Sequence, residues 1–363
     1  MFYRLTTDGR KQSVDLRSLY AGPTSGTCWG VGGGPSLRQE AIEQINVSPA
    51  PVFSMNLAGS GLIRPDFWTS YDPTARFHRS IYLDASILKF VHRTRAMDLI
   101  PETTFKVCDA PATLFFERSR EPGFAEFPTT TSTAEGAVAD WQDSLIQLID
   151  IAYQLGFRKL FLVGCEMLIA PYAALLELGG RYDVAYREKE LLGDFVKRCQ
   201  EAGATESELN DSPVKDQYHF DEVKPLQAAI QTDFHYFRVA QYLRLSRRNM
   251  SLAGLELVSV TPGSRLNDSF PTTTVEAAVT HIRSNVGNPA AEQTRGRYTE
   301  ECSRTPLDVG PMRDFRPHFW KSDAKEDGAV GDNDQKIRQD AGGRLQHALQ
   351  EIPEVIVDLN EHA

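Results

Sequence analysis

Short apolar runs alternate with amphipathic stretches along most of the chain. The apolar runs that are short enough to be buried strands are 27–31, 51–56, 66–72, 79–84, 112–116, 159–163 and 255–260. The stretches whose apolar residues recur at helical spacing are 36–45, 134–155, 225–247 and 276–283. Helices followed by short buried strands are typical of a parallel sheet, so the pattern predicts an α/β fold.

The same pattern divides the chain into regions. Residues 1–23 show no clear periodicity and are expected to be an irregular lead-in to an α/β domain at 24–285. Inside that domain, residues 168–215 are mixed in character, and we expect a helical insertion or lid there. From residue 286 on, Gly, Asp, Glu, Arg and Lys dominate, which predicts a charged, partly irregular extension over 286–363.

Composition and charge narrow the class of protein. The 363 residues carry a net charge of -10, and an acidic surface repels phosphates, so we expect no general nucleic-acid binding. Five cysteines without CxxC spacing indicate a reducing, cytoplasmic setting. No apolar run approaches about 18 residues and the first residues lack a signal-peptide pattern, so no membrane span is expected. A homo-oligomer is compatible with these features.

The first candidate site is a glycine-rich turn. The first predicted strand runs into Gly32, Gly33, Gly34, Pro35 and Ser36, and a helix follows. Glycines let backbone N–H groups approach a phosphate, and the helix adds the positive end of its dipole. No Lys-Ser or Lys-Thr follows, as a Walker A loop requires, and Pro35 replaces the last glycine of a dinucleotide fingerprint. We predict a phosphate site here, with a tight turn that binds nothing as the alternative.

Polar residues at predicted strand ends form the second candidate set. Asn56, Asp72 and Glu166 each follow a short apolar run. In open α/β sheets, ligands bind at the carboxyl ends of the strands, so these side chains are expected to converge near the glycine turn. The alternative is that they cap helices or form turns, as Asn and Asp often do.

Histidine and cysteine provide further candidates. His219 lies in a loop-like stretch and is a candidate general base near neutral pH, with a hydrogen-bonded structural histidine as the alternative. His235 lies among aromatic residues of a predicted helix and is expected to belong to a packed face. Cys165 follows a buried strand without an assigned base, so we interpret it as a small apolar residue.

In their order along the chain, these motifs resemble a known family. The loop GGGPSL at 32–37 resembles the G-x-G-P-S-L loop that bacterial sialyltransferases share with MptE-like 6-hydroxymethylpterin diphosphokinases and uncharacterised phage proteins. The segment LGFRKLFLVGCEM at 155–167 resembles another motif of this set, with Glu166 in place of the usual aspartate. Asn56 resembles their nucleotide-contacting asparagine, whereas Asp72 stands where the sialyltransferases carry an asparagine. The segment 131–133 resembles their donor loop.

The resemblance implies a Rossmann-like, mostly parallel sheet with helices on both faces. It also implies a protein of the cytoplasm of a bacterial or phage-infected cell. It also implies a glycosyltransferase-like enzyme that uses a CMP- or UDP-linked sugar, with an acceptor that no motif identifies. The glycine turn and Glu166 would bind the phosphate, and Asn56, Thr131 and Ser132 the nucleotide. His219 and Asp72 would be catalytic.

Two alternatives stay open. The first is an ATP-dependent diphosphokinase, in which Asp72 and Glu166 would hold Mg²⁺ next to the phosphates. The second is a non-catalytic nucleotide-binding or assembly module. Resemblance at the level of a fold does not fix the reaction.

Overall fold

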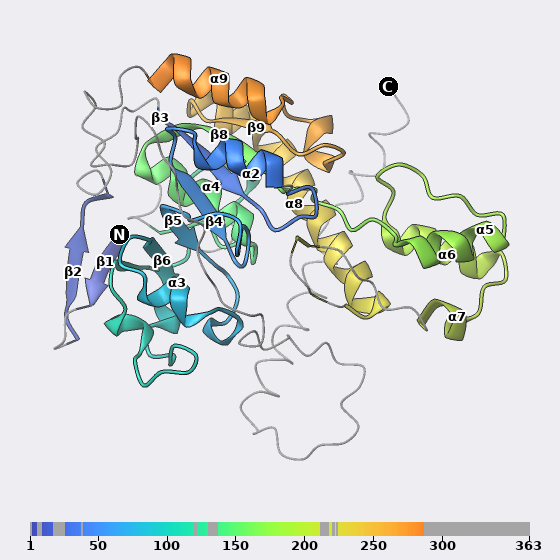
Figure 1. The fold of residues 1–363 in the computed structure, drawn as a ribbon, viewed down its shortest axis with the longest axis horizontal. Helices are drawn as coiled ribbons and strands as arrows, with labels where there is room; N and C mark the ends of the chain where they lie inside the picture. Colours follow the sequence, from blue (N-terminus) through green and yellow to red (C-terminus); the bar gives the residue numbers. More distant parts are fainter. Residues whose placement is uncertain are drawn as a thin grey trace. The chain divides into compact units, whose positions relative to one another are not determined.

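The computed structural model describes most of the first 286 residues (Figure 1). The described residues are 2–5, 9–16, 26–37, 39–119, 122–129, 137–210, 218–219, 222 and 224–286. The extension predicted at 286–363 lies outside them, apart from its first residue.

A single sheet carries the fold of the described residues. Its strands are β1 (Phe2–Leu5), β2 (Lys11–Val14), β3 (Gly26–Val31), β4 (Val52–Met55), β5 (Phe67–Thr69), β6 (Leu88–His92), β7 (Thr113–Phe116), β8 (Phe157–Val163) and β9 (Glu256–Ser259). They lie in the order β2-β1-β7-β6-β5-β4-β3-β8-β9. Every pairing from β7 across to β9 is parallel. The sheet is therefore mostly parallel, which confirms the expected α/β, Rossmann-like class.

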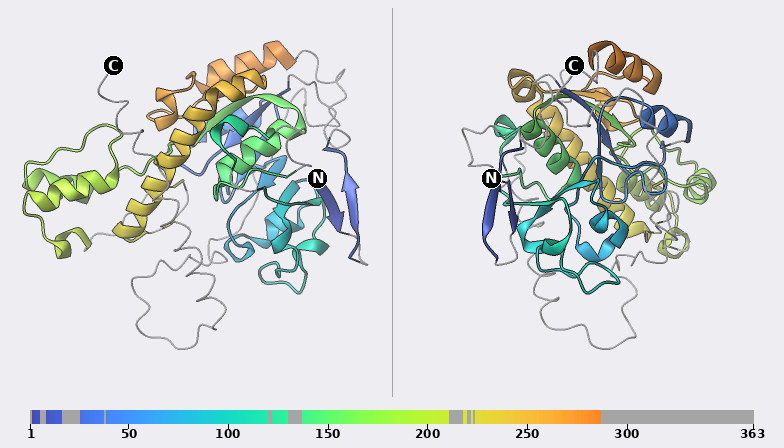
Figure 2. Two further views of the ribbon diagram at one scale, coloured as in Figure 1. Left: turned by 180° about the vertical axis from the view of Figure 1, so that it is seen from behind. Right: turned by 60° about the vertical axis from the view of Figure 1, so that its left-hand side comes forward.

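Helices cover both faces of the sheet (Figure 2). The α-helices are α2 (Gln39–Asn46), α3 (Arg79–Leu83), α4 (Ser144–Leu155), α5 (Ala173–Arg181), α6 (Leu192–Glu201), α7 (Glu206–Asn210), α8 (Leu226–Leu252) and α9 (Val275–Val286). Short 3-10 helices are η1 (Thr74–Arg76), η2 (Arg93–Arg95), η3 (Val107–Asp109), η4 (Phe124–Glu126) and η5 (Arg265–Asp268). The helices α2 and α9 pack together on one face, and α4 and α8 lie on the other. The connection before β4 and the connection before β8 cross the sheet in opposite directions, and the right-handed rule for such connections then puts their helices on opposite faces.

The expected irregular lead-in at 1–23 is wrong for its first part. β1 and β2 form an antiparallel hairpin that adds to the edge of the sheet through β7. Phe2 and Tyr3 are each only 3% exposed, and Phe2 packs edge-on against Phe90. Burial of these two aromatic side chains explains why a segment without clear periodicity joins the sheet. Residues 17–25 lie outside the described part.

The strand predicted at 79–84 is also wrong, because this segment forms α3. Ile81 and Tyr82 are adjacent and both buried, whereas a strand would point them to opposite faces. The strand of this region is β6, which the pattern missed because Lys89 interrupts its apolar run. Lys89 is fully buried, and its Nζ donates to the backbone oxygens of Asp84 (2.6 Å) and Ile87 (2.9 Å).

The central helix α4 begins later than the predicted start at 134. Asp143 caps it by accepting hydrogen bonds from the backbone N–H groups of Leu145 (2.8 Å) and Ile146 (3.0 Å). Residues 137–142, which precede the cap, are not helical, and residues 130–136 lie outside the described part. The predicted end at Gly156 is confirmed, since this glycine adopts φ +106°.

The insertion between β8 and α8 is helical, as expected. Its helices α5, α6 and α7 lie beside α8 and away from the sheet (Figure 1), around a hydrophobic core of their own. The first turns of α8 complete that core with Leu226 and Ala229. A buried ion pair anchors this region to the sheet: Arg265 Nη1 lies 2.8 Å from Asp233 Oδ1, and the two side chains are 5% and 1% exposed.

Membrane spanning receives no support from the described helices. None of them combines the length and the apolar character that a span requires. The longest, α8, has 27 residues and many charged side chains.

Candidate functional site

The order of the strands defines a switch point. From β3 the chain adds β4, β5, β6 and β7 in one direction, and it then crosses to the other side of β3 to add β8 and β9. The carboxyl ends of β3 and β8 are therefore the place where the direction of winding reverses. Ligands of open α/β sheets bind at such a place. Gly32 follows β3 here and Gly164 follows β8.

The glycine turn packs closely against the end of β8. Gly32 N–H donates to Val163 O (2.8 Å), and Gly34 N–H donates to Gly164 O (2.9 Å). A Cβ on Gly32 would overlap the backbone of Gly164, which itself adopts φ +64°. Gly32 and Gly164 are therefore required for close packing of the two strand ends, whether or not a ligand binds.

Glu166 reaches back from the end of β8 onto the turn. Its Oε1 accepts the backbone N–H of Ser36 at 2.8 Å. A Cβ on Gly34 would overlap the carboxylate, so the missing side chain of Gly34 makes room for Glu166. The structure thus brings Glu166 and the glycine turn together, as predicted, with a carboxylate oxygen at the N–H that was expected to meet a phosphate. Pro35 is exposed beside them, and Gly33 O accepts a hydrogen bond from His219 N (3.0 Å).

Asn56 sits at the end of β4 with its side chain already engaged. It adopts φ +52°. Its Oδ1 accepts hydrogen bonds from the hydroxyls of Ser70 (2.6 Å) and Ser144 (2.9 Å), which follow β5 and open α4. The carboxyl edges of β4 and β5 and the start of α4 therefore meet at Asn56. Its interpretation as a nucleotide-binding residue stays a prediction.

Asp72 lies after β5 within a chain of charges. Its Oδ2 is 2.5 Å from Arg76 Nη1, and Arg76 Nη2 is 3.2 Å from Glu222 Oε1. Glu222 is 3.9 Å from the Nζ of Lys224, and these two side chains are 5% and 4% exposed. The contacts of Asp72 thus point to the loop before α8, while those of Glu166 point to the turn.

His219 holds two loops at the glycine turn. Its backbone N–H donates to Gly33 O, and its ring Nε2 accepts the N–H of Gly59 at 2.8 Å. Burial lowers the pKa of His219 to about 4, and a backbone hydrogen bond with Leu57 opposes this shift. The ring is therefore neutral near pH 7, with the Nε2 lone pair in use. These contacts describe a positioning residue in this conformation, and the role of general base stays a prediction.

The predicted donor-loop residues Thr131 and Ser132 lie outside the described residues, so their roles stay predictions. Burial raises the pKa of the Cys165 thiol, and the nearby Glu166 carboxylate adds to the rise. A thiol that stays protonated is a poor nucleophile, in agreement with the interpretation of Cys165 as a small apolar residue.

The sequence pattern missed a polar pair between α8 and the start of α4. His235 Nε2 lies 3.1 Å from Asp143 Oδ2, so the histidine of α8 contacts the cap of α4. The aspartate before the apolar periodicity of α4 could have been recognised as a cap. No signal along the chain pairs it with a histidine 92 residues away.

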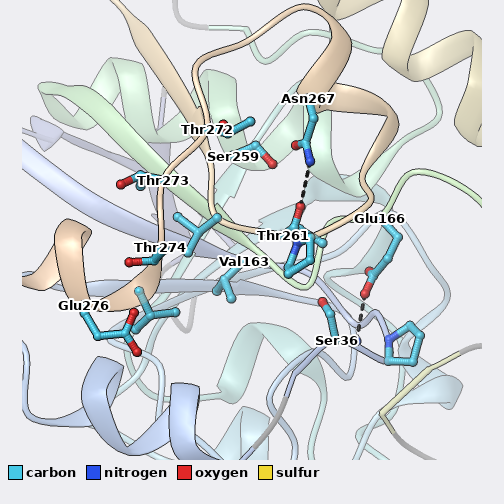
Figure 3. A pocket seen from close by; sticks show the side chains of 14 residues that line it. Ser36, Val163, Glu166, Ser259, Thr261, Asn267, Thr272, Thr273, Thr274 and Glu276 are labelled. Atoms are coloured by element: carbon cyan, nitrogen blue, oxygen red, sulfur yellow. Dashed lines mark hydrogen bonds between the residues drawn. The ribbon is translucent and has the colours of Figure 1, made fainter.

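A pocket of about 730 Å³ opens beside the glycine turn (Figure 3). Its walls come from the turn, the carboxyl ends of β8 and β9, η5 and the start of α9. Polar residues that line it include Ser36, Glu166, Ser259, Asn267, Thr273 and Glu276. In Figure 3, Ser36 and Glu166 face the run Thr272–Thr274 across this space. That threonine run before the last helix is the one signal from which the sequence could have suggested the pocket.

Metal ligands do not gather in the described residues. No group of three or more His, Cys, Asp or Glu side chains has the proximity that a metal ion needs. Asp72 pairs with Arg76 and Glu166 accepts a backbone N–H, and their role as Mg²⁺ ligands stays a prediction.

Comparison with known proteins adds no relative. No protein-family model, curated protein or solved structure matches this chain. The functional argument therefore depends on the sequence motifs and the geometry of the switch point.

Proposed function

We propose that the chain binds a nucleotide-activated sugar at the carboxyl ends of β3 and β8 and transfers the sugar to an acceptor. The observation that carries this proposal is the carboxylate on the glycine turn. Ser36 N–H donates to Glu166 Oε1, so an oxyanion already occupies a backbone N–H of the turn that leads into α2, where we place the phosphate. Glu166 is an internal counterpart of the ligand phosphate in this reading.

Binding then requires an exchange of anions. A phosphate that takes the Ser36 N–H must displace the Glu166 carboxylate, because the two would repel each other at this distance. Once bound, the departing nucleotide phosphate gains negative charge as the sugar leaves. The backbone N–H and the dipole of α2 stabilise that charge. As the sugar–phosphate bond breaks and the acceptor oxygen bonds to the sugar, the acceptor's hydroxyl proton passes to the departing phosphate or to water. His219 contributes by fixing Gly33 and Gly59, and we assign it no proton transfer.

The proposal is tested by nucleotide binding to wild type and to Glu166→Ala. The measurement is the thermal shift of the full chain with CMP, UDP, GDP, ADP and ATP, each with and without Mg²⁺, followed by titration calorimetry. We expect a metal-independent shift with CMP or UDP. Removal of the competing carboxylate should tighten binding by about tenfold or more, since a charge-assisted hydrogen bond contributes about 1.5–3 kcal/mol.

Two variants serve as controls. Glu166→Gln removes the charge and keeps an oxygen that can accept the Ser36 N–H, so it should show a smaller gain. Glu256→Gln changes a carboxylate at the amino end of β9. The proposed site lies at the carboxyl ends of the strands, so this variant should leave binding unchanged. A shift only with ATP and Mg²⁺ would favour the diphosphokinase. Absence of any shift in both wild type and Glu166→Ala would refute the proposal.

A further inference from the structure

Three buried polar atoms without partners surround the pocket beside α9. Ser36 Oγ, Ser259 Oγ and Asn267 Oδ1 have no hydrogen-bond partner among the described residues. All three residues line the same pocket, although they come from the glycine turn, β9 and η5. Ser259 is only 2% exposed, so bulk water does not serve its hydroxyl. Figure 3 shows Ser259 and Asn267 on one wall and Ser36 on another.

Such atoms are unfavourable for stability. A buried polar group that lacks its partner costs about 1–3 kcal/mol, and most buried polar groups in proteins have one. A serine hydroxyl changes direction by rotation about one bond, so the hydroxyls of Ser36 and Ser259 can turn toward an occupant of the pocket. The convergence of three of them on one pocket indicates that a ligand supplies the missing partners.

The lining defines the chemistry of that ligand. The polar groups of the lining are mainly Ser and Thr hydroxyls, with the Asn267 side chain and the carboxylates of Glu166 and Glu276, and they are set among apolar Pro and Val side chains. No Lys, Arg or His belongs to the lining, so away from the Ser36 N–H the side chains favour a neutral group over an anion. A neutral group with many hydroxyls can donate to the carboxylates and to Asn267 Oδ1, and can exchange hydrogen bonds with the serines. The volume of about 730 Å³ falls within the range of small-molecule sites.

We propose that this pocket binds a neutral polyhydroxylated group, such as a pentose or hexose ring, beside the phosphate site. This inference deepens the proposed function by assigning a sugar site. The role of that site in a transfer reaction rests on the proposed function. The binding itself depends only on the pocket. The ring could belong to the donor or to the acceptor, and both present the same chemistry to these walls.

The test is ligand-observed saturation-transfer NMR on the full chain with free ribose, glucose, galactose and N-acetylglucosamine at millimolar concentration. We expect saturation transfer to at least one of these sugars. Ser259→Ala should lower the affinity for that sugar at least fivefold while raising the Tm of the free protein, because it removes an unsatisfied hydroxyl. Ser36→Ala should act in the same two directions.

Two buried serines outside the pocket are the controls. Ser246 Oγ also lacks a described partner, so Ser246→Ala should raise Tm without affecting sugar binding. Ser264 Oγ donates to Cys165 O and accepts from Leu266 N, so Ser264→Ala should lower Tm and leave binding unchanged. Sugar binding that survives in Ser259→Ala and Ser36→Ala would overturn the inference, as would the lack of transfer to every sugar.

Saturating nucleotide separates the two sources of the ring. The competitor in this experiment is a nucleotide that carries its sugar. Saturation transfer to the free sugar that persists beside the bound nucleotide sugar assigns the pocket to an acceptor, whereas competition assigns it to the sugar of the donor. Because free sugars are the probe, a positive result stands even if no nucleotide binds. The failure of the sugar site and the failure of the proposed function are therefore distinguishable.

Discussion

Arg265→Met tests whether the buried ion pair holds the region after β8 in place. Arg265 Nη1 and Nη2 lie 2.8 Å and 3.1 Å from the two oxygens of Asp233. The guanidinium also donates to Met167 O (3.1 Å) and Glu190 O (3.0 Å). Methionine has a similar length and no charge, so the variant leaves Asp233 buried without its counter-ion.

The expected loss follows from what remains around Asp233. Its oxygens still accept the N–H groups of Ile169 (2.8 Å) and Leu192 (2.9 Å), so the carboxylate keeps two of its partners. Breaking a buried pair by removing one partner costs about 3–5 kcal/mol. We expect the free energy of unfolding to fall by about 4 kcal/mol. The backbone N–H of Arg265 donates to Glu166 O (3.0 Å) and is kept in the variant, so weaker nucleotide or sugar binding would report a displacement of η5 from Glu166.

The assay is urea unfolding of the full chain, followed by tryptophan fluorescence. Arg181→Met is the control, because the pair of Arg181 with Glu208 lies at the surface, where water screens it, and should contribute little to stability. Asp233→Asn should be harmful in wild type but partly restorative in Arg265→Met, since it removes the uncompensated charge. A loss below about 1 kcal/mol in Arg265→Met, or no interaction in this double-mutant cycle, would refute the reasoning.

Two further predictions concern neighbouring glycines and one histidine. Gly180 is an exposed helical position with nothing within 4 Å of an added Cβ, so Gly180→Ala should raise unfolding stability by about 0.5–1 kcal/mol, as measured by urea unfolding. In Gly179→Ala the Cβ would lie 2.7 Å from the ring of Phe195, so this neighbouring change should destabilise the protein in the same assay. The pKa of His219 is lowered to about 4, so the unfolded chain takes up a proton below about pH 6.5 that the folded chain does not. Stability is therefore lost as pH falls from 6.5 toward 4, and His219→Asn should lose about 2 kcal/mol less than wild type between pH 7 and pH 4.5. His92, whose pKa burial also lowers to about 4, is present in both proteins and cancels in this comparison, and equal losses would contradict the assignment.

The strands that flank the switch point were predictable because their chemistry is simple. β3 is buried throughout, and β8 is apolar and buried from Leu160 on, as strands covered on both faces must be. β6 was not predictable, because Lys89 is unusual inside a sheet and its carbonyl partners are visible only in three dimensions. The hairpin was missed for a related reason: Phe2 and Tyr3 gain their burial from β7 and its neighbours, which follow about a hundred residues later.

The candidate site was predictable in its position and less so in its contacts. The glycine turn and Glu166 were found because both follow apolar strands, and parallel strands bring their ends together. That Glu166 would accept the Ser36 N–H depends on the direction of one side chain. The threonine run before α9 could have suggested a polar wall, but the unsatisfied Ser259 hydroxyl could not be derived from sequence, since it is defined by what its neighbours in space fail to offer.

The long helix α8 belongs to two hydrophobic cores. Leu226 and Ala229 pack in the core of the insertion, while Leu243 and Met250 pack in the core of the sheet. With 27 residues it is about 40 Å long, and Asp233 lies between the two packed ends. Local opening of the insertion would remove the packing partners of the first turns of α8 only. The ion pair of Asp233 with Arg265 would stop the fraying of α8 at that point. The boundary between two cooperative folding units then lies inside a helix, and amide hydrogen exchange along α8 should change from fast to slow near that aspartate.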